Sequence, residues 1–197
     1  MTHHSQPGRR AFAGLLVASV CLLSARSSAG QFKWMIGGDK NVKYENYKDP
    51  AGRFELELPT KDWKVLPAVG SSLAIFSRKD GPVVSIDRTK LAGRLTPAEV
   101  DALAEIELSR VKEQQPKAKD FKSEMLESKS GRGVLIRYSR VSTEPETVVQ
   151  YSVPAGQDLY RLNGVVPEKL LSKNEAVVMH MIQSFKAAPD SSPTTKH

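Results

Sequence analysis

The sequence of 197 residues contains one cysteine, Cys21, and four histidines. Cys21 lies in an apolar stretch near the N-terminus, so a chain cleaved after that stretch would have no thiol and no disulfide. His3 and His4 precede the same stretch and His197 ends the chain, which leaves His180 as the one histidine of the central region. We therefore expect no metal site built on cysteine or histidine, no Ser-His-Asp triad and no Cys-His pair.

Motifs with a defined spacing are also missing. No segment matches a P-loop, a dinucleotide-binding fingerprint or a calcium-binding loop. The net charge is +7, and without Arg9, Arg10 and Arg26 the remaining 26 basic and 22 acidic residues give +4. The excess of basic residues is mild, and the sequence shows neither a clustered basic helix nor an aromatic platform, so we expect no nucleic-acid partner. Because the cofactor-binding motifs are missing, we also expect no cofactor.

The first 29 residues have the three parts of an export signal peptide. Arg9 and Arg10 form the charged part, residues 11–23 form the apolar part, and Ser27 and Ala29 are small residues suited to a cleavage site. The apolar part is too short to span a bilayer stably, so we expect no transmembrane anchor after processing.

Two details of this segment bear on the export route. Arg9-Arg10-Ala11-Phe12 resembles a twin-arginine signal, although Gly8 stands where such signals usually have serine or threonine, so the general secretory route stays open. Val20 precedes Cys21 where a lipoprotein signal has a small residue, which argues against lipidation. The expected location is periplasmic or extracellular. A thylakoid lumen is less favoured because no transit peptide precedes the twin arginines.

The predicted folded domain spans residues 44–186, between an N-terminal arm at 30–43 and a disordered tail at 187–197 rich in Pro, Ser and Thr. It opens with a turn at 49–52, where proline and glycine fit the required backbone angles. Phe54, Leu56 and Leu58 then alternate with glutamates, which predicts a strand with one buried face. Pro59 ends this strand.

The remaining elements are predicted as further strands and two helices. Strand-like runs occur at 73–77, 83–88, 121–127, 131–139, 148–153 and 160–163. Short turns between them favour antiparallel pairing. Thr96, Pro97 and Glu99 form a helix start with a capping box, and the helix should end near Gln115. A second capping box at 172–175 precedes apolar residues at helical spacing. The expected fold class is α+β, a layered domain of mainly antiparallel strands and two amphipathic helices.

The titratable residues suggest little catalytic chemistry. Helical geometry places His180 opposite the apolar stripe of the second helix, where we expect it to be exposed. Glu107 falls within the stripe of the first helix, and we expect its carboxylate to reach solvent at the margin, with a buried functional carboxylate as the alternative. Four further glutamates are interpreted as surface charge: Glu55, Glu57, Glu144 and Glu146. Paired carboxylates for acid–base catalysis or cation binding remain the alternative.

One group of polar residues is a candidate partner-binding site. Arg137, Gln150 and Arg161 lie on three strands that are expected to be consecutive, at positions assigned to the polar face. If the strands are neighbours, the three side chains share one open sheet surface. The planar guanidinium group suits recognition of carboxylate or phosphate. Ordinary solvated strand polarity is the simpler alternative.

The opening and the close of the predicted domain carry a family resemblance. The run from Tyr47 to Pro59, with Trp63 downstream, resembles the opening of PsbP-like domains, including the bacterial DcrB-type relatives. Residues 160–164 and 182–186 resemble the close of these domains, so the resemblance spans about 42–186. It implies an α/β/α sandwich with a central, mainly antiparallel sheet flanked by two amphipathic helices, and an exported, non-enzymatic role. PsbP proteins support the oxygen-evolving complex of photosystem II, but no metal-ligand pattern carries over to this chain.

These observations favour an exported accessory or protein-binding domain, not an enzyme, with a protein or envelope partner. A small-ligand or cation-binding module of the cell envelope is the first alternative. A carboxylate-dependent hydrolase is the second. A polar sheet face with an apolar patch at its rim would favour partner binding.

Overall fold

The computed structural model describes residues 42–188. The predicted signal peptide, nearly all of the N-terminal arm and residues 189–197 of the tail lie outside the described residues. Within 42–188, no helix combines the length and the apolar composition needed to cross a bilayer.

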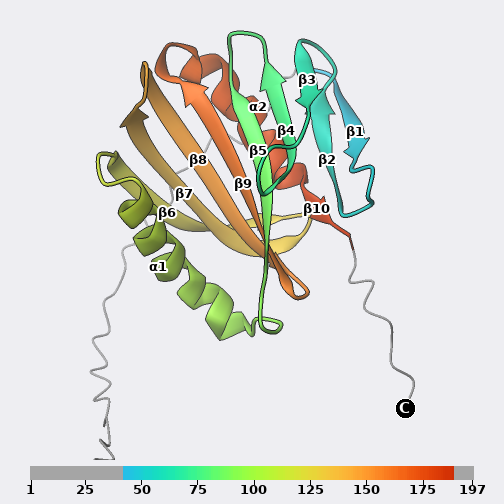
Figure 1. Ribbon diagram of the computed structural model, residues 1–197, viewed down its shortest axis with the longest axis vertical. Coiled ribbons are helices and arrows are strands. Elements are labelled where there is room, and N and C mark those ends of the chain that lie inside the picture. Colours follow the sequence, from blue (N-terminus) through green and yellow to red (C-terminus); the bar gives the residue numbers. More distant parts are fainter. Residues whose placement is uncertain (1–41, 189–197) are drawn as a thin grey trace, which may run out of the picture. The chain divides into compact units, whose positions relative to one another are not determined.

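The core of the domain is a seven-stranded sheet with the order β3-β4-β5-β9-β8-β7-β6 (Figure 1). All neighbouring pairs are antiparallel. The strands are β3 (Trp63–Leu66), β4 (Ser72–Arg78), β5 (Val83–Lys90), β6 (Lys119–Ser128), β7 (Gly131–Val141), β8 (Pro145–Ala155) and β9 (Asp158–Pro167). The predicted antiparallel pairing of the later strands is confirmed.

A second, three-stranded sheet was not predicted. It has the order β1-β2-β10 and consists of β1 (Tyr44–Lys48), β2 (Phe54–Pro59) and β10 (Lys186–Ala187). The alternating run at 54–58 does form a strand, with Phe54, Leu56 and Leu58 buried. β1 lacks this alternation, since its residues are half-buried or exposed, and its pairing with β2 comes from the turn at 49–52.

The first helix, α1 (Pro97–Gln114), begins and ends where the sequence predicts. The Thr96 backbone N–H donates to Glu99 Oε2 at 2.7 Å, and the Glu99 N–H donates to Thr96 Oγ1 at 3.4 Å. This reciprocal pair is the predicted capping box, and it satisfies two of the backbone donors that a helix start leaves open.

The second helix, α2 (Leu171–Ser184), begins differently from the prediction. It continues directly from a 3-10 turn, η1 (Glu168–Leu170), and no side chain caps its first turn. The prediction of a capping box at 172–175 is wrong, because these residues already lie inside the helix. Asn174 instead donates from Nδ2 to the Leu170 carbonyl at 2.9 Å.

The two helices cover opposite faces of the large sheet, which confirms the predicted sandwich (Figure 1). α1 packs on β6 and β7, whereas α2 packs on β9 and β6 and also contacts β2 of the small sheet. The larger apolar core therefore joins both sheets around α2. Its largest fully buried side chains are Tyr151, Phe76, Phe185, Leu56, Ile86, Leu135, Leu162, Met181 and Ile182.

Candidate functional site

The structure separates one of the three candidate binding residues from the other two. β7, β8 and β9 are neighbours, as expected. In the β7–β8 register, however, Arg137 is opposite Val149, while Gln150 is opposite Ile136. Directly opposed residues point to the same face, so Arg137 and Gln150 lie on opposite faces. Arg137 faces α2, where Nη1 lies 3.0 Å from Glu175 Oε1. The expectation of one shared face is wrong for Arg137.

Gln150 and Arg161 do lie on one face, the one that α1 covers. The register places Ser152 opposite Arg161 and Gln150 opposite Asn163. Gln150 is 4% exposed, so its amide is part of the interior and not of an open surface. The prediction failed here because helices cover both faces of β7 and β8, leaving those strands without a solvent face.

Glu107 is the centre of a buried polar cluster beneath α1. Only 1% of this residue is exposed. Its Oε2 accepts hydrogen bonds from Arg161 Nε at 2.9 Å, Arg110 Nη2 at 2.9 Å, Ser152 Oγ at 2.8 Å and Gln150 Nε2 at 3.1 Å. Its Oε1 accepts from Arg161 Nη2 at 2.8 Å. The expectation that this carboxylate reaches solvent is therefore wrong.

The cluster sets the ionisation of Glu107. Burial by itself raises the pKa of a carboxyl group, because the charged form loses its hydration. The hydrogen bonds and charges of Arg161 and Arg110 outweigh that effect and lower the pKa of Glu107 to about 2, from an ordinary value of 4.5. Glu107 is therefore a permanently charged structural anion and is unsuited to act as a general base near neutral pH.

A polar cavity of about 420 Å³ lies beside this cluster. Its wall combines the C-terminal end of α1 with residues of β5, β7, β8 and β9, and it includes Arg161 and Gln150. Asp87 is the one carboxylate among its lining residues, and it accepts hydrogen bonds from Ser72 Oγ at 2.9 Å and Asn163 Nδ2 at 3.0 Å. The lining therefore has no second acid with which Asp87 could share acid–base catalysis.

The half of this sheet face that α1 leaves uncovered forms an open face (Figure 1). We define the open face as the α1 side of β3, β4 and β5 together with Asn163 and Val165 of β9, because Arg161 and Leu159 of β9 lie beneath α1. One row of directly paired residues crosses this face, from Leu66 on β3 through Ile75 on β4 and Ser85 on β5 to Asn163 on β9. The last three are half-buried, whereas Leu66 is 41% exposed and, in the loop that follows β3, Val69 is 70% exposed. A mixed polar and apolar surface with an apolar rim results.

His180 is not fully exposed, contrary to the prediction. Its Nε2 lies 2.7 Å from Glu57 Oε2, and its ring stacks on Tyr44 with the ring centroids 3.9 Å apart. Lys129 Nζ also contacts Glu57, at 2.6 Å from Oε1. Helical periodicity correctly placed His180 away from the large sheet, but the small sheet covers that side of α2.

The four glutamates interpreted as surface charge each have a basic partner. The pairs are Glu55 with Lys186, Glu57 with Lys129, Glu144 with Lys169 and Glu146 with Arg140. Across residues 42–188, no group of three or more His, Cys, Asp or Glu side chains is arranged to hold a metal ion.

No model of a protein family matches the sequence, and no curated protein matches it. Several solved structures do resemble the chain. Cyanobacterial PsbP (CyanoP) from Synechocystis is 13% identical, with a TM-score of 0.56 over 77% of this chain and 96% of that one. The Ran-binding protein Mog1p of Saccharomyces cerevisiae is 9% identical, with a TM-score of 0.52 over 75% and 97%. LpqN of Mycobacterium tuberculosis, involved in cell envelope biogenesis, is 16% identical, with a TM-score of 0.50 over 77% and 94%.

These similarities extend over nearly the whole length of each solved structure, and they agree with the antiparallel sheet between two helices. At such low sequence identity they establish the fold. The domain formed by residues 42–188 has the PsbP-like fold.

Proposed function

We propose that this protein is an exported, non-enzymatic accessory domain that binds a partner protein of the cell envelope through the open face. The observation that carries the proposal is the open face itself. A large sheet normally buries each face against another layer. Here α1 packs on β6 and β7, so the other half of the same face is left for a partner.

The composition of the open face suits a protein partner. Its apolar residues are Ile75, Val83 and Val165. Beside them on the same face lie the hydroxyl of Ser85, the carboxylate of Asp87 and the amide of Asn163. Non-obligate protein interfaces have this mixture of apolar and polar area, with apolar anchors at their centre. Mog1p, which has the same fold, is a Ran-binding protein. The exported location rests on the signal-like residues 1–29.

The interface proposal is tested with a lysine scan of exposed apolar residues. The full-length protein, tagged at its C-terminus, is expressed in its native host and recovered after reversible crosslinking. We expect the double variant Leu66→Lys/Val69→Lys to lose most of the partner recovered with the wild-type protein. The matched control is Ile106→Lys/Val141→Lys, since Ile106 and Val141 are 60% and 76% exposed but lie away from the open face.

The control variant should recover the partner at the wild-type level, and all variants should melt within a few degrees of one another, because exposed substitutions change stability little. A crosslinked protein recovered equally well by both double variants would show that the open face is not the binding surface. The absence of any specifically crosslinked protein would overturn the proposed function as a whole.

The export proposal is tested by cell fractionation and mass spectrometry of the purified protein. We expect a periplasmic or secreted form that begins at Gly30, after removal of residues 1–29. Replacing Arg9 and Arg10 with lysines should block export only if the twin-arginine route is used. A cytoplasmic, full-length product would contradict the exported role.

A further inference from the structure

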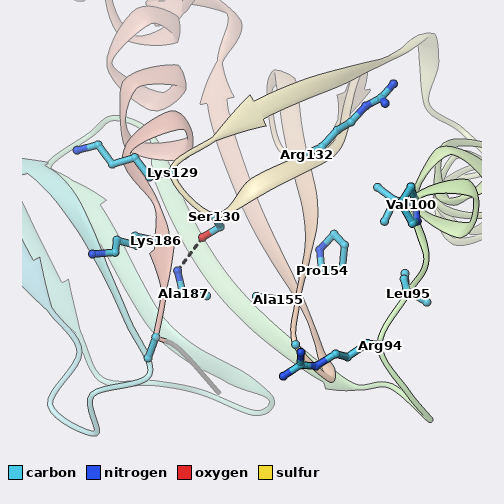
Figure 2. A pocket seen from close by; sticks show the side chains of 13 residues that line it. Arg94, Leu95, Val100, Lys129, Ser130, Arg132, Pro154, Ala155, Lys186 and Ala187 are labelled. Atoms are coloured by element: carbon cyan, nitrogen blue, oxygen red, sulfur yellow. Dashed lines mark hydrogen bonds between the residues drawn. The ribbon is translucent and has the colours of Figure 1, made fainter. Parts of the chain in front are cut away.

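A second cavity, remote from the polar cavity, lies where the two sheets and the start of α1 meet. It has a volume of about 750 Å³. Its wall comes from the loop before α1, the first turns of α1, the β6–β7 hairpin, the β8–β9 turn and β10 (Figure 2). The hairpin is fixed to β10, because Ser130 Oγ accepts from the Ala187 N–H at 2.7 Å and donates to the Phe185 carbonyl at 3.1 Å.

The charged residues that line this basic cavity all carry positive charge. They are Arg94, Lys129, Arg132 and Lys186, which come from three separate segments of the chain: the loop before α1, the β6–β7 hairpin and β10. These residues lie around the cavity in Figure 2, where the charged ends of Lys129, Lys186 and Arg132 point outward at its rim. Among the described residues 42–188, no aspartate or glutamate belongs to the lining. Pro97 and Val100, in the first turns of α1, also line the cavity. The aligned peptide dipoles of a helix give its N-terminal end a positive potential, which adds to that of the basic side chains.

The acidic partners of Lys129, Arg132 and Lys186 lie outside the lining. Lys129 Nζ lies 2.6 Å from Glu57 Oε1, and Arg132 Nη2 lies 3.2 Å from Asp101 Oδ1. Lys186 Nζ lies 3.1 Å from Glu55 Oε1. Each of the three basic side chains is more than half exposed. Exposed ion pairs of this kind contribute little net stability, so a ligand can compete with them.

Because Lys129, Arg132 and Lys186 already have carboxylate partners, a competing ligand has to offer more than one carboxylate. A single carboxylate gains little, because each cation would only exchange one partner for another. Several closely spaced carboxylates, held on one chain, engage several cations together and gain from their fixed spacing. The floor of the cavity is apolar, formed by small or half-buried side chains such as Leu95, Pro154 and Ala155. This floor suits the backbone and methylene groups of a peptide.

The cavity is less suited to the other anionic macromolecules. No aromatic residue of the described part of the chain lines it, so this part offers no stacking platform for single-stranded nucleic acid. The exposed large apolar residues of the described chain are Val65, Leu66, Val69, Ile106 and Val141. None of them belongs to this lining, so no apolar side chain is placed there to enter a lipid bilayer.

The geometry points to a peptide-binding site: the basic cavity binds an extended, acidic segment of a protein, with carboxylates on Arg94, Lys129, Arg132 and Lys186 and its backbone on the apolar floor. This site is distinct from the open face, so the two assignments can fail separately.

The test measures binding of a fluorescein-labelled peptide, Ala-Asp-Glu-Asp-Glu-Ala, to the full-length protein by fluorescence anisotropy. We expect saturable binding that weakens as salt rises to about 150 mM, because exposed charges are screened over roughly 8 Å there. The variant Arg132→Glu/Lys186→Glu should bind about tenfold more weakly or worse. The matched control Lys79→Glu/Lys173→Glu changes the net charge equally with exposed lysines that lie outside the cavity and off the open face, and it should bind as the wild type does.

Equal loss in both double variants would show a general charge effect and would overturn the proposal. So would equal binding of the Asn/Gln version of the peptide, or no binding at low salt. Vesicles containing phosphatidylglycerol and inorganic phosphate serve as separate probes. If vesicles bind at the cavity and the acidic peptide does not, the site is a membrane contact. If phosphate binds and the peptide does not, the site is a simple anion site. Either result rejects the peptide assignment.

Discussion

Replacing Glu107 with glutamine is expected to lower the free energy of unfolding by about 3 kcal/mol at pH 7. The substitution keeps the size of the side chain but removes the charge that neutralises Arg161 and Arg110. Breaking a buried ion pair by removing one partner typically costs about 3–5 kcal/mol. The lower end applies here because the side chains of Arg161 and Arg110 are partly exposed and can recover some hydration. Chemical denaturation of the two proteins measures the difference.

The loss of unfolding free energy caused by Glu107→Gln should become smaller as the pH falls. The pKa of Glu107 falls from 4.5 to about 2 on folding. The stability that this group contributes is therefore fully present above about pH 4.5 and is lost as the pH falls through 2. A shift of this size corresponds to about 3 kcal/mol, of which roughly 1.5 kcal/mol remains at pH 3. The difference between wild type and Glu107→Gln should shrink accordingly between pH 5 and pH 3.

Glu105→Gln is the matched control. Glu105 is exposed on the same helix, so its replacement should change the free energy of unfolding by no more than about 0.5 kcal/mol. A Glu107→Gln protein as stable as this control would show that the cluster does not stabilise the fold. A difference that stays constant down to pH 3 would contradict the lowered pKa of Glu107.

Replacing Gly164 with alanine is expected to cost about 1–3 kcal/mol of unfolding free energy, the usual range for overpacking a core. Gly164 lies on β9 where α2 crosses, and an added Cβ would lie 2.4 Å from Val178 Cγ1. Val178 is fully buried and β-branched, so within a helix it has one preferred rotamer and cannot turn aside. The helix must therefore move away from the sheet.

A double-mutant cycle identifies this cause. Val178→Ala removes the methyl groups that an alanine at 164 would meet, so the double variant should be more stable than the sum of the single effects predicts, by about 1 kcal/mol or more. Gly93→Ala serves as the control, because nothing lies within 4 Å of a Cβ at that position. Additive effects of the two core substitutions, measured by thermal and chemical denaturation, would exclude the helix–sheet contact as the cause.

Local sequence chemistry determined most of the secondary structure. The capping residues Thr96 and Glu99 fixed the start of α1, because each satisfies a backbone group of the other. The alternation of Phe54, Leu56 and Leu58 fixed a strand, because successive side chains of a strand point to opposite faces. The short turns between the later strands fixed their antiparallel pairing. These signals act within a few residues, so they can be recognised without knowing the fold.

Only the tertiary structure decided which polar side chains meet. Arg137 and Gln150 differ by one step in the β7–β8 register, and that single step places them on opposite faces. Glu107 and Arg161 are 54 residues apart, and His180 and Glu57 are 123 residues apart. The one local sign of the buried cluster was a glutamate between Leu103 and Val111 in the apolar stripe of α1.

The sequence by itself thus determined the two helices and most strands of the large sheet, since hydrophobic periodicity and capping are local properties. The small sheet, the buried Glu107 cluster, the open face and the basic cavity were decided by how distant segments pack. Their physical basis is register and layer coverage, which depend on contacts between residues far apart in the chain. A charged side chain is buried or exposed according to which distant segments cover it, and the local sequence around the residue does not contain that information.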